Sequence, residues 1–325
     1  MTKEMRNRTI DRTIWFATAA ALTLTAASWL GGTLWVAELL THFRFQFAAG
    51  GLILMTVAIA CRRRAALAAA ALVFVANSLP LLPYAMPIAA DAHAGEARLR
   101  IMAVNVRYSN HDYERALALI AAENPDVVGL QEVTDAWIEG VSGLRERYPY
   151  RVVWPDDGAH GLALFSRVPI EELGDSPYRE ADQLTAIRVK VDLPDRPVIL
   201  TLAHLIAPTT PKRSRIRNRQ IRTIAGMVAT DREMEHIVIG DLNITPWSPH
   251  YAALEQAGLA NAARGRGYTA TWPAMLGPLG IPIDHVLLSA GLHAQQVRSG
   301  ASFGSDHLPI VADLALPAAP LHPSQ

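Results

Sequence analysis

Polar residues that could handle a metal ion or a phosphate recur directly after or before short aliphatic runs of this chain. The set comprises Asn105, Glu132, His204, Asp241, Asn243, Asp284, Asp306 and His307. Carboxylates and amides without thiolates are the donors preferred by hard cations such as Mg²⁺ or Mn²⁺. Histidines beside them suit proton transfer or stabilisation of phosphate charge. The residue types therefore predict metal-assisted phosphoester chemistry.

The aliphatic runs predict the strands that must position these side chains. Strands are expected at residues 99–106, 126–130, 151–154, 161–165, 185–191, 198–203, 236–239, 283–288 and 310–314, and helices at 113–123, 134–147 and 212–230. Several strands are adjacent in sequence with no helix between them, which argues against a simple parallel βαβ fold. We expect an α/β domain in which two sheets form a sandwich with helices outside, so that strand ends bring distant residues together.

Three uncharged runs in the first 84 residues predict a membrane anchor. They span residues 14–37, 45–61 and 65–84, and Pro80 and Pro83 are expected to end the last one. The alternative is a cleaved signal peptide followed by core helices. The first run is too long for the apolar segment of a signal peptide, and two more runs follow it.

Basic residues predict the orientation of the anchor. Four lie in the N-terminal tail and three form the run Arg62, Arg63 and Arg64, so both segments are expected in the cytoplasm. Three crossings then place the rest of the chain outside the cytoplasm, which is the periplasm if the source is a Gram-negative bacterium. The sequence thus predicts a multi-pass protein of the inner (plasma) membrane with an extracytoplasmic catalytic domain.

The domain organisation follows from these segments. We expect an anchor at residues 1–84, a linker at 85–97, a catalytic domain at 98–316 and a tail at 317–325. The first 90 residues carry eight Lys and Arg against three acidic residues, a net charge of +5, and the remainder is at −5. A −5 body is not typical of a protein that holds nucleic acid by bulk charge. Cys61, the only cysteine, is expected to be a small buried apolar residue.

Seven short motifs in order resemble the endonuclease/exonuclease/phosphatase superfamily, which has the deoxyribonuclease I-like fold, and in particular a membrane-anchored bacterial subgroup. They are Val104-Asn105-Val106, Gly129-Leu130-Gln131-Glu132-Val133, Gly161-Leu162-Ala163-Leu164-Phe165-Ser166-Arg167, Ala203-His204-Leu205, Gly240-Asp241-Leu242-Asn243, Ile283-Asp284-His285 and Ser305-Asp306-His307-Leu308-Pro309-Ile310. One such motif occurs by chance, whereas the ordered series is specific. The resemblance covers residues 99–316.

The resemblance implies roles for the metal site. Glu132 would be the principal ligand of Mg²⁺ or Mn²⁺, Asn105 would lie beside the metal, and Asp306 would lie close to it.

The resemblance also implies roles in hydrolysis. Asp241 would orient or deprotonate the attacking water. Asn243 would contact the phosphoryl group, and His204 would donate to a phosphate oxygen, so both would bind substrate. His307 would act as general acid/base or stabilise the transition state, and Asp284 would hold it in the productive tautomer.

Structural explanations compete with these roles. Asn105 could be a turn residue at a strand end, and Glu132 could interact with the N-terminus of the next helix. Asp241 and Asn243 could form an Asx turn, and His204 could be a satisfied core histidine.

Two further histidines have a more ordinary interpretation. His285 is expected to be structural, since only Asp284 of that pair matches the motif. His160 is expected to be a solvated loop residue.

The expected helix at residues 212–230 begins with many basic residues. They are Lys212, Arg213, Arg215, Arg217, Arg219 and Arg222. Arg215, Arg219 and Arg222 share one face, which could be a solvated outer face or could contact polyanions or anionic lipid headgroups. Trp247 and Trp272 could stack on a base or touch lipid, although tryptophans in such loops are more often packed.

Three functions compete at this point. The first is a membrane-anchored phosphodiesterase acting on lipid or other envelope phosphoesters, which the anchor favours. The second is an extracytoplasmic nuclease with the same site, which the acidic body disfavours. The third is an inactive binding or sensing module, which the intact residue set argues against. The expected partners are the membrane and a phosphoester substrate, and no protein partner is predicted.

Overall fold

The computed structural model describes residues 3–88, 97–174, 184–193 and 197–316. The chain forms two compact units, Met1–Ala85 with Trp247–His250, and Met86–Pro246 with Tyr251–Gln325. Most of the expected linker and the expected tail lie outside the described residues. The two units are described separately below.

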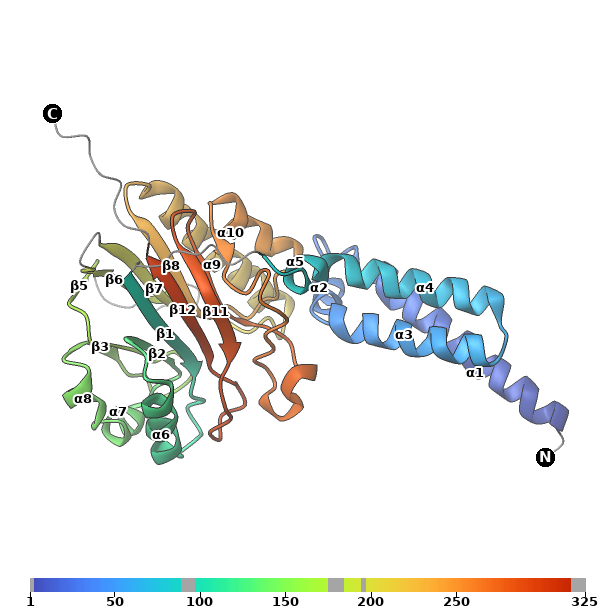
Figure 1. Cartoon of the computed structure of the whole chain (residues 1–325), viewed down its shortest axis with the longest axis horizontal. Helices are drawn as coiled ribbons and strands as arrows, with labels where there is room; N and C mark the ends of the chain where they lie inside the picture. The colour runs from blue at the N-terminus through green and yellow to red at the C-terminus, as the bar shows by residue number, and fades with distance from the viewer. Residues whose placement is uncertain (1–2, 89–96, 175–183, 194–196, 317–325) are drawn as a thin grey trace. The chain divides into compact units, whose positions relative to one another are not determined.

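The N-terminal unit is helical (Figure 1). Its elements are α1 (Lys3–Ser28), α2 (Trp35–Thr41), α3 (Arg44–Ala60), α4 (Arg64–Ser78), the 3-10 helix η1 (Leu79–Leu81) and α5 (Leu82–Ala85). The first uncharged run, residues 14–37, is divided between two helices, because α1 ends at Ser28 and α2 starts at Trp35. Gly31 and Gly32 lie in the intervening turn, and glycine is unfavourable in a helix interior.

Only some of these helices are long and apolar enough to cross a membrane. Among the described residues, Arg64–Ala85 is long and apolar enough to cross a membrane. The pair Trp35–Thr41 and Arg44–Ala60 passes the same test together but is bent by 67°. The three predicted spans therefore stay a prediction, of which the third has the strongest support.

Close packing and buried polar contacts hold the helices of this unit together. A Cβ at Gly51 of α3 would lie 2.8 Å from the backbone nitrogen of Phe74 in α4, so glycine permits the close approach of these two helices. Asn77 of α4 donates to Thr25 Oγ1 at 3.0 Å and accepts from Arg44 Nη1 at 3.0 Å. These bonds link α1, α3 and α4 and satisfy polar groups that are buried.

The second unit contains two six-stranded mixed sheets (Figure 1). The first has the order β11-β12-β1-β2-β4-β3, with β1 (Ala97–Asn105), β2 (Val127–Gln131), β3 (Tyr150–Trp154), β4 (Leu162–Ser166), β11 (His293–Ser299) and β12 (Ile310–Leu316). The second has the order β5-β6-β7-β8-β10-β9, with β5 (Ile170–Glu172), β6 (Thr185–Val191), β7 (Val198–His204), β8 (Glu235–Asp241), β9 (Ala260–Asn261) and β10 (Asp284–Leu288).

Helices cover the outer faces of both sheets. They are α6 (Tyr113–Glu123), α7 (Asp135–Gly140), α8 (Leu144–Arg147), α9 (Pro211–Thr230) and α10 (Ala252–Gln256). The 3-10 helices η2 (Pro249–Tyr251) and η3 (Ala274–Leu279) lie in the connections between β8 and β10, and η3 has no buried residue. Trp137 of α7 and Phe165 of β4 belong to one buried cluster, and Ile221 of α9 and Val238 of β8 belong to another. The expected sandwich of two sheets with helices outside is confirmed.

Glycines explain one wrong helix boundary. A single helix was expected over residues 134–147, but α7 ends at Gly140 and α8 restarts at Leu144, with Gly143 between them. Thr134 caps the start of α7, since its side chain accepts a hydrogen bond from Trp137 N at 3.2 Å.

Gly240, directly before Asp241 at the end of β8, has a φ of +124°. A Cβ there would lie 2.1 Å from the carbonyl oxygen of Ala203 in β7. We expect Gly240→Ala to lower the free energy of unfolding by about 3 kcal/mol or more, because backbone strain adds to a steric overlap. Urea unfolding followed by circular dichroism measures the change.

Gly226→Ala in α9 is the matched control, because nothing lies within 4 Å of the position that a Cβ would take there and alanine favours helices. Equal stability of the two variants would contradict the prediction.

Candidate active site

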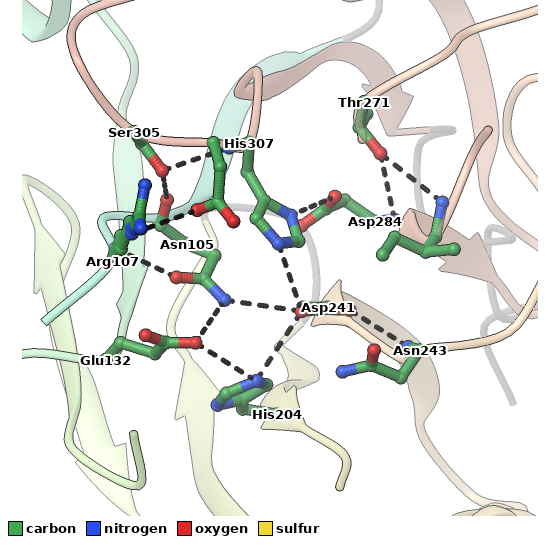
Figure 2. A network of polar contacts seen from close by, with 12 residues as sticks. Asn105, Arg107, Glu132, His204, Asp241, Asn243, Thr271, Asp284, Ser305 and His307 are labelled. Atoms are coloured by element: carbon green, nitrogen blue, oxygen red, sulfur yellow. Dashed lines mark hydrogen bonds and ion pairs between the residues drawn. The ribbon is translucent and has the colours of Figure 1, made fainter. Parts of the chain in front are cut away.

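The predicted site residues meet at one edge of the two sheets (Figure 2). Asn105 ends β1 and Glu132 follows β2 in the first sheet, whereas His204 ends β7 and Asp241 ends β8 in the second. Because β1 and β2 are parallel, and β7 and β8 are parallel, each pair ends at the same side of its sheet. The antiparallel strands β10 and β12 bring in Asp284 and His307 from the opposite direction.

Two carboxylates face the same amide. Asn105 Nδ2 donates to Glu132 Oε1 at 2.8 Å and to Asp241 Oδ2 at 3.3 Å. Asn105 Oδ1 accepts from the backbone nitrogen of Arg107 at 2.9 Å, and Glu132 Oε2 accepts from that of Tyr108 at 3.2 Å. Glu132 has a φ of +61°, a left-handed conformation that is unfavourable for a residue other than glycine. The backbone therefore holds this carboxylate in place at some energetic cost.

His204 lies against both carboxylates. Its Nε2 is 3.5 Å from Asp241 Oδ2 and 3.9 Å from Glu132 Oε1. Burial lowers the pKa of His204, but the hydrogen bond and charge of Asp241 and the charge of Glu132 outweigh it, so the pKa is raised. A protonated His204 can donate to an anionic oxygen, which agrees with its predicted contact with phosphate.

His307 and Asp284 form a buried pair that joins the two sheets. His307 Nδ1 donates to Asp284 Oδ2 at 2.9 Å, and His307 Nε2 lies 3.7 Å from Asp241 Oδ2. Burial lowers the pKa of His307, but the charges of Asp284 and Asp241 raise it to about 10. Asp284 accepts the Nδ1 proton and so directs Nε2 towards Asp241, and its role in catalysis stays a prediction.

Two hydroxyl groups position this pair. Thr271 Oγ1 accepts from the backbone nitrogen of Asp284 at 3.2 Å. Ser305 Oγ donates to the backbone oxygen of Asn105 at 2.7 Å and accepts from the backbone nitrogen of His307 at 3.1 Å. Thr271 was not among the predicted site residues, because its contribution is a backbone contact that no motif reveals.

Asp241, in the turn after β8, forms an Asx turn and also presents a carboxylate oxygen to the site. Its Oδ1 accepts from the backbone nitrogen of Asn243 at 2.9 Å, which is the Asx-turn contact, while Oδ2 faces the site. Asn243 has a φ of +49°, and its Nδ2 donates to the Leu205 carbonyl at 2.8 Å. Asn243 therefore links the turns after β7 and β8, and one hydrogen of its amide is already used.

Asp306 lies at the rim of the site. Its side chain is partly exposed, and its Oδ1 is 3.9 Å from Arg107 Nε. The predicted proximity of Asp306 to the metal stays a prediction.

The donor set fits a hard divalent cation. Among the described residues, Asp241, Asp284 and His307 offer ligand atoms that lie within 4.8 Å of one another. The carboxylates of Glu132 and Asp241, which both accept hydrogen bonds from the Asn105 amide, provide a second group of oxygen donors. A carboxylate pair of this kind repels itself unless a cation or donor lies between its members, and oxygen donors suit Mg²⁺ or Mn²⁺.

A buried arginine holds the turn that carries Asn243. Arg217 of α9 is 0% exposed, and its Nη1 donates to the backbone oxygen of Asn243 at 2.6 Å. Its neighbour Gln220 accepts from the backbone nitrogen of Ile206 at 3.0 Å, so α9 also holds the turn after His204. The sequence placed Arg215, Arg219 and Arg222 on one face of this helix and assigned Arg217 to no face. Its helical spacing from Ile221 was the signal that it belongs to the buried face.

Replacing Arg217 with methionine is expected to lower kcat/KM about 10–100-fold, because the turn that carries Asn243 loses its support. Stability should fall by about 1–3 kcal/mol for each buried acceptor left without a donor. Arg217→Lys should lose less of both, since lysine keeps a donor. Steady-state kinetics and urea unfolding measure the two effects.

Arg219→Met is the control, because Arg219 is exposed on the same helix. An Arg217→Met variant that loses stability but keeps full kcat/KM while folded would show that Arg217 does not position the site.

Two other histidines lie as expected for structural and surface residues. His285 is buried, donates from Nε2 to the Ile244 carbonyl at 2.7 Å and accepts at Nδ1 from Asn261 at 3.0 Å. Burial lowers the pKa of His285, so the ring stays neutral with both nitrogens satisfied. His160 is exposed. Trp272 is half-buried, as is Trp247.

The profile of the Endonuclease/Exonuclease/phosphatase family matches residues 102–307, which include every predicted site residue. The chain belongs to the endonuclease/exonuclease/phosphatase family. As a member of that family it is a phosphoester hydrolase that uses a divalent metal. No curated protein matches the chain.

Solved structures agree with the family's fold. An endonuclease/exonuclease/phosphatase from Beutenbergia cavernae is 23% identical with a TM-score of 0.57, over 69% of this chain and 73% of that one. D. rerio TDP2 humanised by 14 mutations is 18% identical with a TM-score of 0.56, over 67% and 98%. The human nocturnin catalytic domain with bound sulfate is 20% identical with a TM-score of 0.53, over 68% and 95%. These identities show the shared fold of the family.

Proposed function

We propose that the protein is a membrane-anchored phosphodiesterase that acts on a lipid or other envelope phosphoester. The observation that carries the chemistry is the convergence of Glu132 and Asp241 with His204 and the Asp284–His307 pair at one sheet edge. A carboxylate pair flanked by two histidines provides metal binding, phosphate binding and proton transfer within one site.

The metal would be held by Glu132, with Asp241, Asn105 and Asp306 as the remaining candidate donors. When bound, the divalent ion would neutralise charge on the phosphoryl oxygens. Asn105 Oδ1 is bonded to a backbone nitrogen in the orientation found here, so the amide would ligate through oxygen only after rotation. Asn105 Nδ2 donates to both carboxylates, which holds Glu132 and Asp241 close to one another.

The remaining groups act on water and phosphate. Asp241 Oδ2 accepts hydrogen bonds in the centre of the site and would orient the attacking water. His204 Nε2 would donate to a non-bridging oxygen. His307 Nε2 would protonate the departing oxygen or stabilise the transition state, and its bond to Asp284 keeps that nitrogen aimed at the substrate. In-line displacement depends mainly on such positioning and charge neutralisation.

Two observations support a lipid or envelope substrate: the apolar helix of the N-terminal unit and the net negative charge of the rest of the chain. A helix that can cross a membrane favours a substrate at a bilayer, and a −5 body disfavours tight binding of nucleic acid. Extracytoplasmic nuclease activity with the same site is the second candidate. An inactive sensing module is the third, and the complete residue set speaks against it.

One experiment separates these candidates. The full chain in detergent, with and without Mg²⁺, is offered phospholipid vesicles, plasmid DNA and the soluble diester bis(p-nitrophenyl) phosphate. We expect Mg²⁺-dependent hydrolysis of phospholipid and of the soluble diester. Preferential cleavage of DNA would support the nuclease, and no hydrolysis of any substrate would support the inactive module.

The localisation that we propose is the inner (plasma) membrane, with three crossings and the catalytic domain outside the cytoplasm. Reporter fusions after Ala90 test this orientation. Fusions that are active only in the cytoplasm would overturn it.

A further inference from the structure

A short loop beside the active site exposes apolar side chains to solvent. We call residues 272–281 the apolar loop. Met275 is 89% exposed, Leu276 48% and Leu279 56%. Scattered exposed apolar residues are ordinary, but three within five positions form a patch that needs a partner.

The stem of the apolar loop is held in place by hydrogen bonds. Trp272 and Ile281 form an antiparallel bridge, with Ile281 N donating to Trp272 O at 2.5 Å and Trp272 N donating to Ile281 O at 3.0 Å. Tyr268 donates its hydroxyl to the Gly280 carbonyl at 2.6 Å. The exposed side chains therefore project from an ordered stem.

The same stem is bonded to the catalytic residues. Thr271 receives the backbone hydrogen bond of Asp284, and the backbone nitrogen of Ala274 donates to the Asp306 carbonyl at 2.7 Å. Leu308, directly after His307, donates its backbone nitrogen to the Thr271 carbonyl at 2.8 Å. The apolar loop is thus connected on both sides to the Asp284–His307 pair, and it borders the site.

A lipid bilayer fits the apolar loop and its surroundings. No charged residue occurs between Arg266 and Asp284, so the loop can enter the acyl boundary without carrying charge into it. Helix α9, which leaves the same sheet edge after His204, exposes basic side chains that suit anionic headgroups: Lys212, Arg213, Arg215, Arg219 and Arg222. The chain also contains a helix long enough to cross a bilayer.

We propose that the apolar loop inserts into the surface of an anionic bilayer and delivers a lipid phosphoester to the site. The proposal rests on the proposed lipid substrate and deepens it, because it assigns the recognition of lipid to Met275, Leu276 and Leu279. The loop acts on the approach of the substrate and not on the chemical step. Its loss therefore affects substrates in a bilayer and spares soluble ones.

The first test measures insertion of the apolar loop into the bilayer independently of enzymatic activity. Met275→Cys in a Cys61→Ala background is labelled with an environment-sensitive fluorophore, and the full chain is reconstituted in vesicles of phosphatidylglycerol and phosphatidylcholine. We expect blue-shifted emission that spin-labelled lipid quenches. Tyr150→Cys on β3, an edge strand of the first sheet, is 38% exposed; it is the control and should show neither effect.

The second test reads activity on two substrates. The triple variant Met275→Ser, Leu276→Ser and Leu279→Ser is expected to hydrolyse vesicle phospholipid about ten-fold more slowly, because less apolar surface is buried on docking. Its rate on bis(p-nitrophenyl) phosphate should be unchanged, and Tyr150→Ser should change neither rate.

Several results would overturn the proposal. They are an unquenched label on residue 275, equal losses on both substrates, and a signal that follows protein concentration instead of lipid, which would assign the loop to a second copy of the chain. Failure of the proposed function is distinct, because it would appear as absent Mg²⁺-dependent turnover in the unmodified protein while quenching still reports insertion.

Discussion

Replacing His307 with glutamine is expected to lower kcat for phosphodiester hydrolysis about 10²–10⁴-fold, with a smaller change in KM. His307 Nε2 lies 3.7 Å from Asp241 Oδ2, and its Nδ1 is bonded to Asp284. Glutamine keeps a polar side chain there but cannot transfer a proton or carry a positive charge. Single-turnover kinetics with the soluble diester measure the chemical step directly.

The Asp284–His307 pair should behave as a unit. Asp284→Asn alone is expected to reduce kcat by a comparable factor, because the amide no longer selects the Nδ1–H tautomer. The kcat of the double variant should be only slightly lower than that of either single variant, since both substitutions remove the function of the same hydrogen-bonded pair.

His160→Gln is the matched control for the histidine substitution, because His160 is exposed and outside the contacts described for the site. Losses that multiply in the double variant would show that Asp284 and His307 act separately. Full activity of His307→Gln would remove His307 from the mechanism altogether.

Replacing Glu132 with glutamine should abolish most metal-dependent activity and raise the half-saturating Mg²⁺ concentration about ten-fold or more. Glutamine has the same length and keeps an oxygen that can accept the 2.8 Å hydrogen bond from Asn105 Nδ2. The substitution therefore removes a charge and preserves the shape. Any loss reports on the negative charge that the metal requires.

A second readout separates metal binding from catalysis. Added Mg²⁺ should raise the Tm of the unmodified protein, because a ligand that binds only the folded state stabilises it. It should leave the Tm of Glu132→Gln unchanged. Without metal the variant should be at least as stable as the unmodified protein, since one of two facing carboxylates is neutral.

Glu139→Gln is the corresponding control, because Glu139 is exposed on α7. If Glu132→Gln kept the normal Mg²⁺ dependence, the cation site would have to be sought at Asp241, Asp284 and His307, whose ligand atoms also lie close together.

The elements with strong local signals could be predicted from the sequence. Helix α6 has the expected bounds, because its apolar spacing and the Asn124-Pro125 stop are both local. Convergence of the site was also predictable, since each chemical residue flanks a buried aliphatic run and parallel strands end at the same edge. The family resemblance pointed to the same residues, and the family is confirmed.

What sequence reasoning missed depends on contacts between distant segments. Arg217 donates a hydrogen bond to the carbonyl of Asn243, 26 residues away along the chain. No local pattern in the sequence indicates that contact. The Asn243 amide bonds to Leu205 because the turns after β7 and β8 meet, which only the pairing of the strands establishes. Strands β5, β9 and β11 were not predicted, because β5 and β9 are very short and β11 lacks a clear alternating pattern.

The predicted site residues come from both sheets, so the activity that we propose depends on the packing of one sheet on the other. Asn105 ends β1, Glu132 directly follows β2 and His307 precedes β12 in the first sheet, whereas His204, Asp241 and Asp284 lie in β7, β8 and β10 of the second. The 2.9 Å bond between His307 and Asp284 crosses that seam. A small displacement of one sheet relative to the other would leave every strand intact and still separate His307 from Asp284. The turnover rate should therefore respond to small displacements between the sheets that a measurement of secondary structure would not detect.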